Sequence, residues 1–432
     1  MSMTTYALIL VGLFLVLMAI GIPIAFSLSG AAIITVLITG EFTITAIVHR
    51  LIGNASSYTL LAIPFFILAA KLMNTGSITE RIFGAASAWV GWVPGGLGHA
   101  NVVASIVFSG MSGSAVADAG GLGQVEVDAM KKDGFDAEFS AAVTCASATI
   151  GPIIPPSVPM VVYGMMTEVS VGALFMGGII PGLLLALGCS ILVFFISVKR
   201  NYPRKKFSWS EVGMSTYRSL LSLMTPVIII GGIWSGVFSP TEAAAVAVAY
   251  AFFLSVIVYR ELSLNDIFVA LQETVRDSAG ILLIICGAAS FSWLVTMLGI
   301  TNAMSAMLAA LTDNKYVMLL ILNVAFLIIG MFMEALAVMT ITVPFLIPLM
   351  AVFDIDPVHL GVVLVLNLMI GLSTPPVGTS LFICAKVAGI TVENMYKAIL
   401  PFLIPLIAVL FLITYVPGLV TWLPTMLGMI TG

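Results

Sequence analysis

Two stretches of the sequence place hydroxyl side chains beside closely spaced prolines within apolar surroundings. They are "TIGPIIPPSVPM", from Thr149 to Met160, and "GLSTPPVGTS", from Gly371 to Ser380. A proline inside a helix removes a backbone donor and costs about 3 kcal/mol, so we expect a helix to break at each stretch. Carbonyl oxygens without helical partners and Ser or Thr hydroxyls are hard ligands that suit a cation such as Na⁺. Each stretch is therefore a candidate cation site.

A glycine-containing segment precedes each double proline by the same distance. Gly110 lies 45 residues before Pro155, and Gly330 lies 45 residues before Pro375. The surrounding sequences, "FSGMSGSAVADAGG" and "IIGMFMEALAVMT", divide apolar runs that are too long for half a membrane crossing and too short for two. Irregular backbone at membrane depth must be buried in protein or line a cavity. We therefore expect both segments to be tips of re-entrant helical hairpins.

Each tip combined with its proline stretch predicts one sodium site. The first site is expected to contain Gly110, Gly113, Ser114, Gly151, Pro155 and Ser157. The second is expected to contain Gly330, Glu334, Thr374, Pro375, Gly378 and Thr379. Helices that begin after the tips would direct their positive dipole ends at an anionic solute. Na⁺ is thus the expected coupling ion, at two or more sites.

Several of these residues also have simpler interpretations. Asp118 could only stabilise the start of the outgoing hairpin helix, although a carboxylate inside a membrane is a functional candidate by default. Glu242 in "SPTEAAA" fits a capping box with Ser239 as the N-cap. Pro155 and Pro156 alone could form an ordinary kink. The cysteines lack C-x-x-C spacing and are expected to be packed side chains, and the scattered histidines, which lack metal spacing, are expected to be interfacial or packed.

The elements that carry these residues must be membrane helices. Hydrophobic residues make up 61% of the 432 residues and charged residues only 8%, and the mean hydropathy is +1.19. Apolar segments of about 20 residues follow one another through the chain, and their backbone can be satisfied in lipid only as helices, because they lack barrel-type alternation. The N-terminus lacks the features of a signal peptide and is expected to be the first membrane helix. The predicted fold class is an all-α polytopic membrane protein.

The sequence contains an internal repeat with an offset of 220 residues. Pro155, Pro156 and Pro181 align with Pro375, Pro376 and Pro401, and Gly110 aligns with Gly330. Such a block indicates duplication. An odd number of crossings between the copies would invert the second one, and inverted repeats are typical of secondary transporters, in which broken helices bind solute and ions near the midplane.

The repeat divides the chain into segments, and the family resemblance given below implies which of them form a scaffold and which a transport domain. Two segments, 43–58 and 264–280, mix apolar and charged positions as helices lying in the membrane surface do. The predicted segments are 1–72 (scaffold and first lateral arm), 73–167 (repeat 1, hairpin 97–130, broken helix 135–166), 168–280 (scaffold and second arm), 281–390 (repeat 2, hairpin 316–352, broken helix 357–388) and 391–432 (C-terminal helix).

The loop from Lys199 to Trp209 indicates the orientation. It holds five of the sixteen Lys and Arg residues, and the positive-inside rule places it in the cytoplasm. Counting crossings from this loop places both termini on the periplasmic side.

Four motifs carry a resemblance to a known family. "SGSAVADAGGLG", "TIGPIIPPSVPMVVYG", "SPTEAAA" and "NLMIGLSTPPVGTS" resemble the large membrane subunit of tripartite ATP-independent periplasmic (TRAP) transporters, over nearly the whole chain. The resemblance implies a sodium-driven permease of the bacterial inner membrane with an elevator mechanism. It also implies a periplasmic binding protein that delivers an organic acid, a small four-helix membrane subunit as partner, contact with lipid, and no nucleic acid partner.

The resemblance also implies roles for individual residues. Ser112, Ser114 and Asp118 match the hairpin serines and aspartate near the substrate, and Glu334 matches an acidic residue at the second tip. Related chains often carry an arginine near the position of Met297, so its absence leaves open how a substrate carboxylate is bound.

Other function classes fit the sequence less well. No H-E-x-x-H or P-loop motif occurs, and no loop is long enough for a nucleotide-binding domain, so we expect neither a hydrolase nor an ATP-driven pump. The nearest alternative is a stand-alone sodium-coupled carboxylate carrier of related inverted-repeat architecture that needs no binding protein. The residues do not choose among C4-dicarboxylates, sialic acid and other small organic acids.

Overall fold

The computed structural model describes residues 3–74 and 77–430, and all regular elements of these residues are helices. The outermost residues of the predicted first and last segments, and residues 75 and 76 of the predicted repeat 1, lie outside the described residues. Among the described residues, seven helices are long and apolar enough to cross a membrane, or eight if the bent pair Ile44–Ala55 and Tyr58–Met73 is one span. The prediction of an all-α polytopic membrane protein is confirmed.

The helices divide into two halves of similar order. The first half contains α1 (Met3–Ala19), α2 (Ile24–Thr39), α3 (Ile44–Ala55), η1 (Tyr58–Leu61), α4 (Ala62–Met73), α5 (Ser77–Val90), α6 (Gly96–Ser112), α7 (Ala115–Ala117), η2 (Asp118–Leu122), α8 (Gly123–Lys132), α9 (Ala137–Ala148), α10 (Val158–Thr167) and α11 (Val171–Arg200). The second half contains α12 (Trp209–Trp234), α13 (Pro240–Phe252), η3 (Phe253–Val258), α14 (Leu264–Met297), α15 (Ile300–Ala309), α16 (Lys315–Phe332), α17 (Ala335–Val352), α18 (Pro357–Leu372), α19 (Thr379–Ala388), α20 (Val392–Tyr415) and α21 (Gly418–Met426).

The starting points of the helices repeat with the offset found in the sequence. The helices α7 and α17 begin at residues 115 and 335, α9 and α18 begin at 137 and 357, and α3 and α14 begin at 44 and 264, each pair 220 residues apart. The N-caps of the last pair correspond too, because the Thr43 and Ser263 side chains each accept a bond from a backbone N–H of the helix they precede. The duplication therefore includes α3 and α14. The inversion of the second copy stays a prediction.

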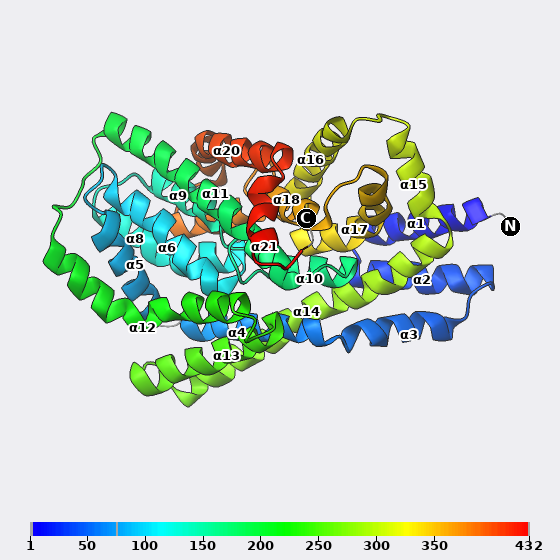
Figure 1. Cartoon of the computed structure of the whole chain (residues 1–432), viewed down its shortest axis with the longest axis horizontal. Coiled ribbons are helices and arrows are strands. Elements are labelled where there is room, and N and C mark those ends of the chain that lie inside the picture. The colour runs from blue at the N-terminus through cyan, green and yellow to red at the C-terminus, as the bar shows by residue number, and fades with distance from the viewer. Residues whose placement is uncertain (1–2, 75–76, 431–432) are drawn as a thin grey trace.

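The buried apolar residues form two separate cores. The larger core includes both hairpins and both broken helices, whereas the smaller one is built from α1, α2, Ile47 of α3 and the C-terminal part of α14, with Phe14 and Phe291 in ring contact. Figure 1 shows α1, α2 and α3 together at one end of the long axis, with α5 and α12 at the other. The molecule is thus elongated, and the hairpins belong to its larger part.

The longest helix, α14, connects the two cores. Its 34 residues span about 50 Å at the usual helical rise, more than a bilayer core requires. It packs against α2, α3, α4, α15 and α17, and in Figure 1 it runs past α4 toward α3. The predicted second lateral arm, 264–280, is the first half of this helix, so the predicted segment boundary at 280 falls inside a continuous element.

Both hairpins and both broken helices occupy the positions that the prolines and glycines suggest. The first hairpin is α6 followed by α7, η2 and α8, and the second is α16 followed by α17. The chain leaves helical geometry between α9 and α10 and again between α18 and α19, at the two double prolines. The Pro155–Pro156 and Pro375–Pro376 peptide bonds are both cis.

Candidate functional site

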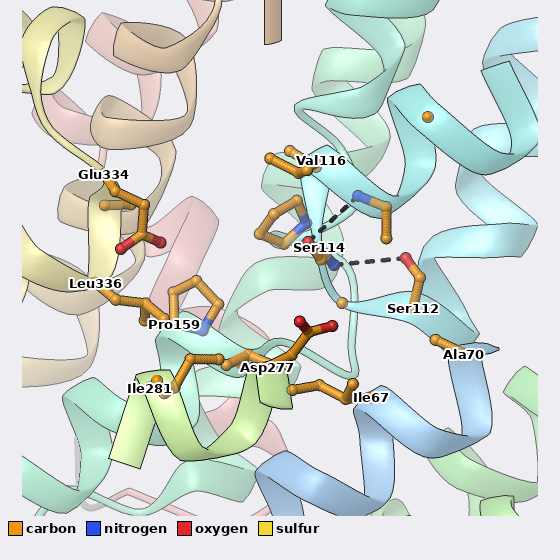
Figure 2. Close-up of a pocket in the computed structure, with 18 of the residues that line it drawn as sticks. Ile67, Ala70, Ser112, Ser114, Val116, Pro159, Asp277, Ile281, Glu334 and Leu336 are labelled. Carbon is orange, nitrogen blue, oxygen red and sulfur yellow. Dashed lines mark hydrogen bonds between the residues drawn. The ribbon is translucent and has the colours of Figure 1, made fainter. Parts of the chain in front are cut away.

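The tip of the first hairpin is held together by serine hydroxyls. The helix α6 ends at Ser112, and the next residue, Gly113, has a φ of 60°, in the left-handed region that glycine tolerates best. The Ser114 hydroxyl accepts a hydrogen bond from the Ala117 N–H at 3.4 Å, and the Ser112 hydroxyl accepts one from the Ser114 N–H at 3.4 Å. Figure 2 shows both bonds as dashed lines. The tip is therefore a compact turn stabilised by its own polar groups.

This tip lies directly against the first broken helix. A Cβ built on Gly113 would meet the Pro156 carbonyl oxygen at 2.6 Å, and one built on Gly151 would meet Asp118 Oδ2 at 2.3 Å. The Ser112 hydroxyl donates to the other carboxylate oxygen of Asp118. Asp118 is buried, and its Oδ2 has no hydrogen-bond partner. An unpartnered carboxylate oxygen thus faces the unwound backbone of the predicted first sodium site.

The second tip contacts its own broken helix in the same way. A Cβ built on Gly371 would meet the Gly330 carbonyl carbon at 2.7 Å, and the Gly378 N–H donates to the Met331 carbonyl at 3.1 Å. Glu334 is the residue before α17, and its side chain is exposed. The structure therefore brings each tip together with its proline stretch in both repeats.

One cavity of about 1140 Å³ lies between the two hairpin tips. Five of the sequence-predicted residues line it, namely Ser112, Gly113, Ser114, Glu334 and Thr379. In Figure 2 the Glu334 carboxylate points into this space from one side and Ser112 and Ser114 lie on the other. Residues separated by about half of the chain thus share one chamber.

The remaining predicted residues do not line this cavity. Those that belong to the tips and the broken helices behind it are Asp118, Gly151, Pro155, Ser157, Gly330, Thr374, Pro375 and Gly378. Ser157 is buried and accepts a hydrogen bond from the Met160 N–H at 3.2 Å as the N-cap of α10. Gly110 is different, because it lies inside α6, where a Cβ would meet Pro226 Cβ of α12 at 2.4 Å. Gly110 therefore allows α6 to pack closely against α12 and is not part of the turn at the tip.

The opposite wall of the cavity contains a charged cluster from α4 and α14. Lys71 Nζ lies 2.9 Å from Glu273 Oε2 and 2.9 Å from Asp277 Oδ2, and its side chain is 24% exposed. Figure 2 shows the Asp277 carboxylate pointing into the cavity above Ile67 and Ile281. We define the Lys71 cluster as these three charged residues. Sequence reasoning missed it, although a lone lysine in an apolar helix is itself a signal of a functional site.

Two positions discussed from the sequence lie elsewhere. Met297 is the last residue of α14, is 49% exposed and does not line the cavity. Arg276 of the same helix does line it. At the start of α13, Ser239 and Glu242 form both bonds of a capping box, so the capping role of Glu242 is confirmed.

Comparison with known proteins identifies the family. Residues 11–419 match the family described as "Tripartite ATP-independent periplasmic transporter, DctM component". The chain is 44% identical over 405 residues to the "Sialic acid TRAP transporter large permease protein SiaM" of Vibrio cholerae, covering 94% of this chain and 95% of that protein. It is 37% identical over 433 residues to the "C4-dicarboxylate TRAP transporter large permease protein DctM" of the same species, covering 95% and 96%. These relatives are named as transporter permease proteins and not as enzymes.

A solved structure shares the fold. The Alcanivorax borkumensis YdaH transporter superposes with a TM-score of 0.64 at 15% identity, covering 87% of this chain and 88% of that one. At this identity the likeness concerns the fold alone. Taken with the family match and the similar lengths of the relatives, it leads to one conclusion: the chain belongs to the large permease proteins, the DctM component, of TRAP transporters.

Proposed function

We propose that this chain is the translocating subunit of a sodium-coupled importer of a small organic acid in the bacterial inner membrane. A periplasmic binding protein would deliver the acid, and a small four-helix membrane subunit would assemble with the chain. The two hairpins and broken helices would move as a transport domain against a scaffold. The basic loop at 199–209 would face the cytoplasm and both termini the periplasm.

One observation carries the proposal, namely the convergence of both hairpin tips on one cavity. Each tip contacts an unwound proline stretch. Hydroxyl groups, such as those of Ser114 and Thr379, or a carboxylate lie beside it. Half-helices and unwound carbonyls that meet at one place are the usual ion and solute sites of secondary transporters. The repeated arrangement favours two sodium sites.

The cavity is lined by four acidic residues, Asp266, Glu273, Asp277 and Glu334, and by two basic ones, Lys71 and Arg276. An anionic solute therefore needs a basic group that no carboxylate neutralises. Two carboxylates neutralise Lys71, whereas no carboxylate oxygen lies within 4 Å of the Arg276 guanidinium among residues 3–74 and 77–430. We therefore propose Arg276 as the group that attracts the substrate carboxylate in place of the arginine expected near Met297.

The chemical class of the solute follows from the relatives. SiaM is named for sialic acid and DctM for C4-dicarboxylates. Both are organic acids, and a cavity of about 1140 Å³ has room for either. We propose sialic acid as the first solute to test, because the chain is more similar to SiaM.

Reconstitution into proteoliposomes tests the proposal. Uptake of labelled sialic acid and of a C4-dicarboxylate would be measured with and without the binding protein and the small subunit. We expect uptake only with all three components and an inward sodium gradient. Uptake by the isolated chain would favour the stand-alone carrier, and uptake that persists when choline replaces sodium would refute the coupling.

A further inference from the structure

A second buried carboxyl group lies deeper in the first hairpin than the proposed sodium site. Glu126 of α8 is 1% exposed. Its Oε2 accepts a hydrogen bond from Asn101 Nδ2 at 2.7 Å, and the same amide nitrogen lies 2.7 Å from Thr144 Oγ1. The Ser147 hydroxyl donates to Asn101 Oδ1 at 2.7 Å. The second carboxylate oxygen of Glu126, Oε1, is buried and has no hydrogen-bond partner.

No positive charge compensates this carboxyl group. Within the described part of the chain, no Lys, Arg or His nitrogen lies within 4 Å of Glu126. An ionised carboxylate that is buried without a paired charge costs several kcal/mol, so such a group binds a proton instead. One neutral amide donor does not replace the hydration of two carboxylate oxygens.

The recorded neighbours of the Glu126 carboxyl are neutral or acidic. Asn101 of α6 donates to it and to Thr144 of α9, and the Cys384 thiol of α19 and the Asp118 carboxyl of η2 lie within electrostatic range. The acidic neighbour disfavours a second negative charge in the same hairpin.

The remaining charged groups nearby are directed elsewhere. On α8 itself, Asp128, Lys131 and Lys132 are exposed. The helix α5 also packs against α8, and its Arg81 guanidinium lies 4.4 Å from the centre of the Tyr259 ring. Glu80 of α5 and Lys386 of α19 are exposed as well, and Glu138 of α9 accepts a hydrogen bond from Asn394 of α20. The buried His99 of α6 lies more than 4 Å from the Glu126 carboxylate, as do the described Lys and Arg nitrogens.

The second repeat shows that the fold does not require this acid. The position equivalent to Glu126 at the 220-residue offset is Leu346, which is buried in α17, and the position equivalent to Thr144 is Leu364. The same hairpin architecture is thus built there with apolar side chains at these two positions. A buried acid in one copy alone indicates a function in binding and not a need of packing.

We propose that Glu126 is a proton-binding site of the transport hairpin, and that its proton weakens cation binding at the neighbouring Asp118. The second clause rests on the proposed sodium coupling, whereas the first does not. When the proton leaves as the pH rises, the new negative charge strengthens the attraction of Asp118 and the tip for Na⁺. The sodium concentration for half-maximal uptake should therefore fall with rising pH.

Infrared spectroscopy of the purified full chain tests the proton site directly. A protonated carboxyl group has its own carbonyl stretching band in the infrared spectrum. We expect this band to be weaker in Glu126→Gln at neutral pH, by the intensity of one carboxyl group. Glu126→Leu, which copies Leu346, should give the same loss without introducing an amide. Asp128→Asn is the matched control, because this carboxyl belongs to the same helix but is exposed, and it should leave the band unchanged. An undiminished band in both Glu126 variants would overturn the proposal.

Sodium titrations of uptake by the assembled transporter test the second clause. The pH shift of the half-maximal sodium concentration should be present in the unaltered chain and in Asp128→Asn, and lost in Glu126→Gln. An equal shift in Glu126→Gln would overturn the linkage. Uptake that does not respond to sodium at any pH would instead refute the proposed function, and the infrared band would still decide the proton site.

Discussion

At the scale of single residues, the polar atoms of the two tips determine what the chamber can bind. The Ser114 hydroxyl accepts a backbone bond at 3.4 Å, which leaves a further lone pair available. Thr379 is the first residue of α19 and also lines the cavity. The Ser114 hydroxyl thus belongs to the first hairpin and the Thr379 hydroxyl to the second broken helix. Each would bind a different sodium ion.

Removing either hydroxyl should weaken the dependence of uptake on sodium. For Ser114→Ala and, separately, Thr379→Val, we expect about a tenfold higher sodium concentration for half-maximal uptake, equivalent to about 1.4 kcal/mol for one lost ligand. Sodium titrations of uptake in proteoliposomes measure this change.

The control must account for the capping role of Ser114, because an N-cap serine alone can contribute about 1 kcal/mol to stability. Ser170 caps α11 with the same bond, from the Ala173 N–H at 3.2 Å. Ser170→Ala should therefore leave the sodium titration unchanged. Unaltered titrations for both Ser114→Ala and Thr379→Val would refute the two sodium sites.

The Lys71 cluster illustrates which residues of the site the sequence could not predict. Lys71 and Glu273 are 202 positions apart, and no pattern in either helix indicates that they pair. The tips, in contrast, could be predicted, because glycine and proline act locally on the backbone and the repeat shows them twice. Long-range ion pairs depend on tertiary packing and leave no local signal.

At the scale of elements, local sequence signals again predict the structure better than features that depend on tertiary packing. The hairpins and broken helices lie close to the predicted ranges because apolar run lengths and breaks determine them. The continuity of α14 could not be predicted, because its charged residues Glu273, Arg276 and Asp277 are typical of a surface helix. Whether these three side chains face lipid, water or a cavity depends on the packing of α4 against α14. The sequence of α14 alone does not reveal that packing.

The contact between a tip and its broken helix should depend on the missing side chain at Gly113. In Gly113→Ala the new Cβ would meet the Pro156 carbonyl oxygen at 2.6 Å and would also require a left-handed residue at φ 60°. We expect the tip to separate from the proline stretch, so the half-maximal sodium concentration should rise at least tenfold. Titration of sodium-dependent uptake measures the effect.

Gly134 provides the matched control for this change. It also has a positive φ, 90°, but nothing lies within 4 Å of a Cβ built on it. Gly134→Ala should cost about 1–2 kcal/mol in backbone strain, seen as a lower unfolding temperature, with a normal sodium titration. If both variants show the same titration, the contact at Gly113 has no part in ion binding.

At the scale of the whole molecule, the proposed mechanism requires the first hairpin to move relative to α4. Asn74 follows the last residue of α4 and lies against Gly121 of η2, where a Cβ would be 2.6 Å from Asn74 Cγ. Since Asn74 Cβ is one carbon–carbon bond from Cγ, the two Cβ positions lie no more than about 4 Å apart, close enough for a disulfide. Asn74 lies two residues beyond the predicted end of the scaffold segment at 72 and directly follows the scaffold helix α4, so a disulfide at this pair would hold the first hairpin to that helix.

Oxidation of the double variant Asn74→Cys with Gly121→Cys should stop uptake, and reduction should restore it. The reason is that a disulfide would fix the hairpin to α4 in the arrangement described here, whereas an elevator must change that contact in each cycle. Transport by the assembled complex would be measured before and after oxidation, with the extent of cross-linking measured by mass spectrometry. Each single-cysteine variant, oxidised in the same way, controls for Cys145, Cys189, Cys286 and Cys384. Full cross-linking with undiminished uptake would mean that the solute crosses without movement between these two parts.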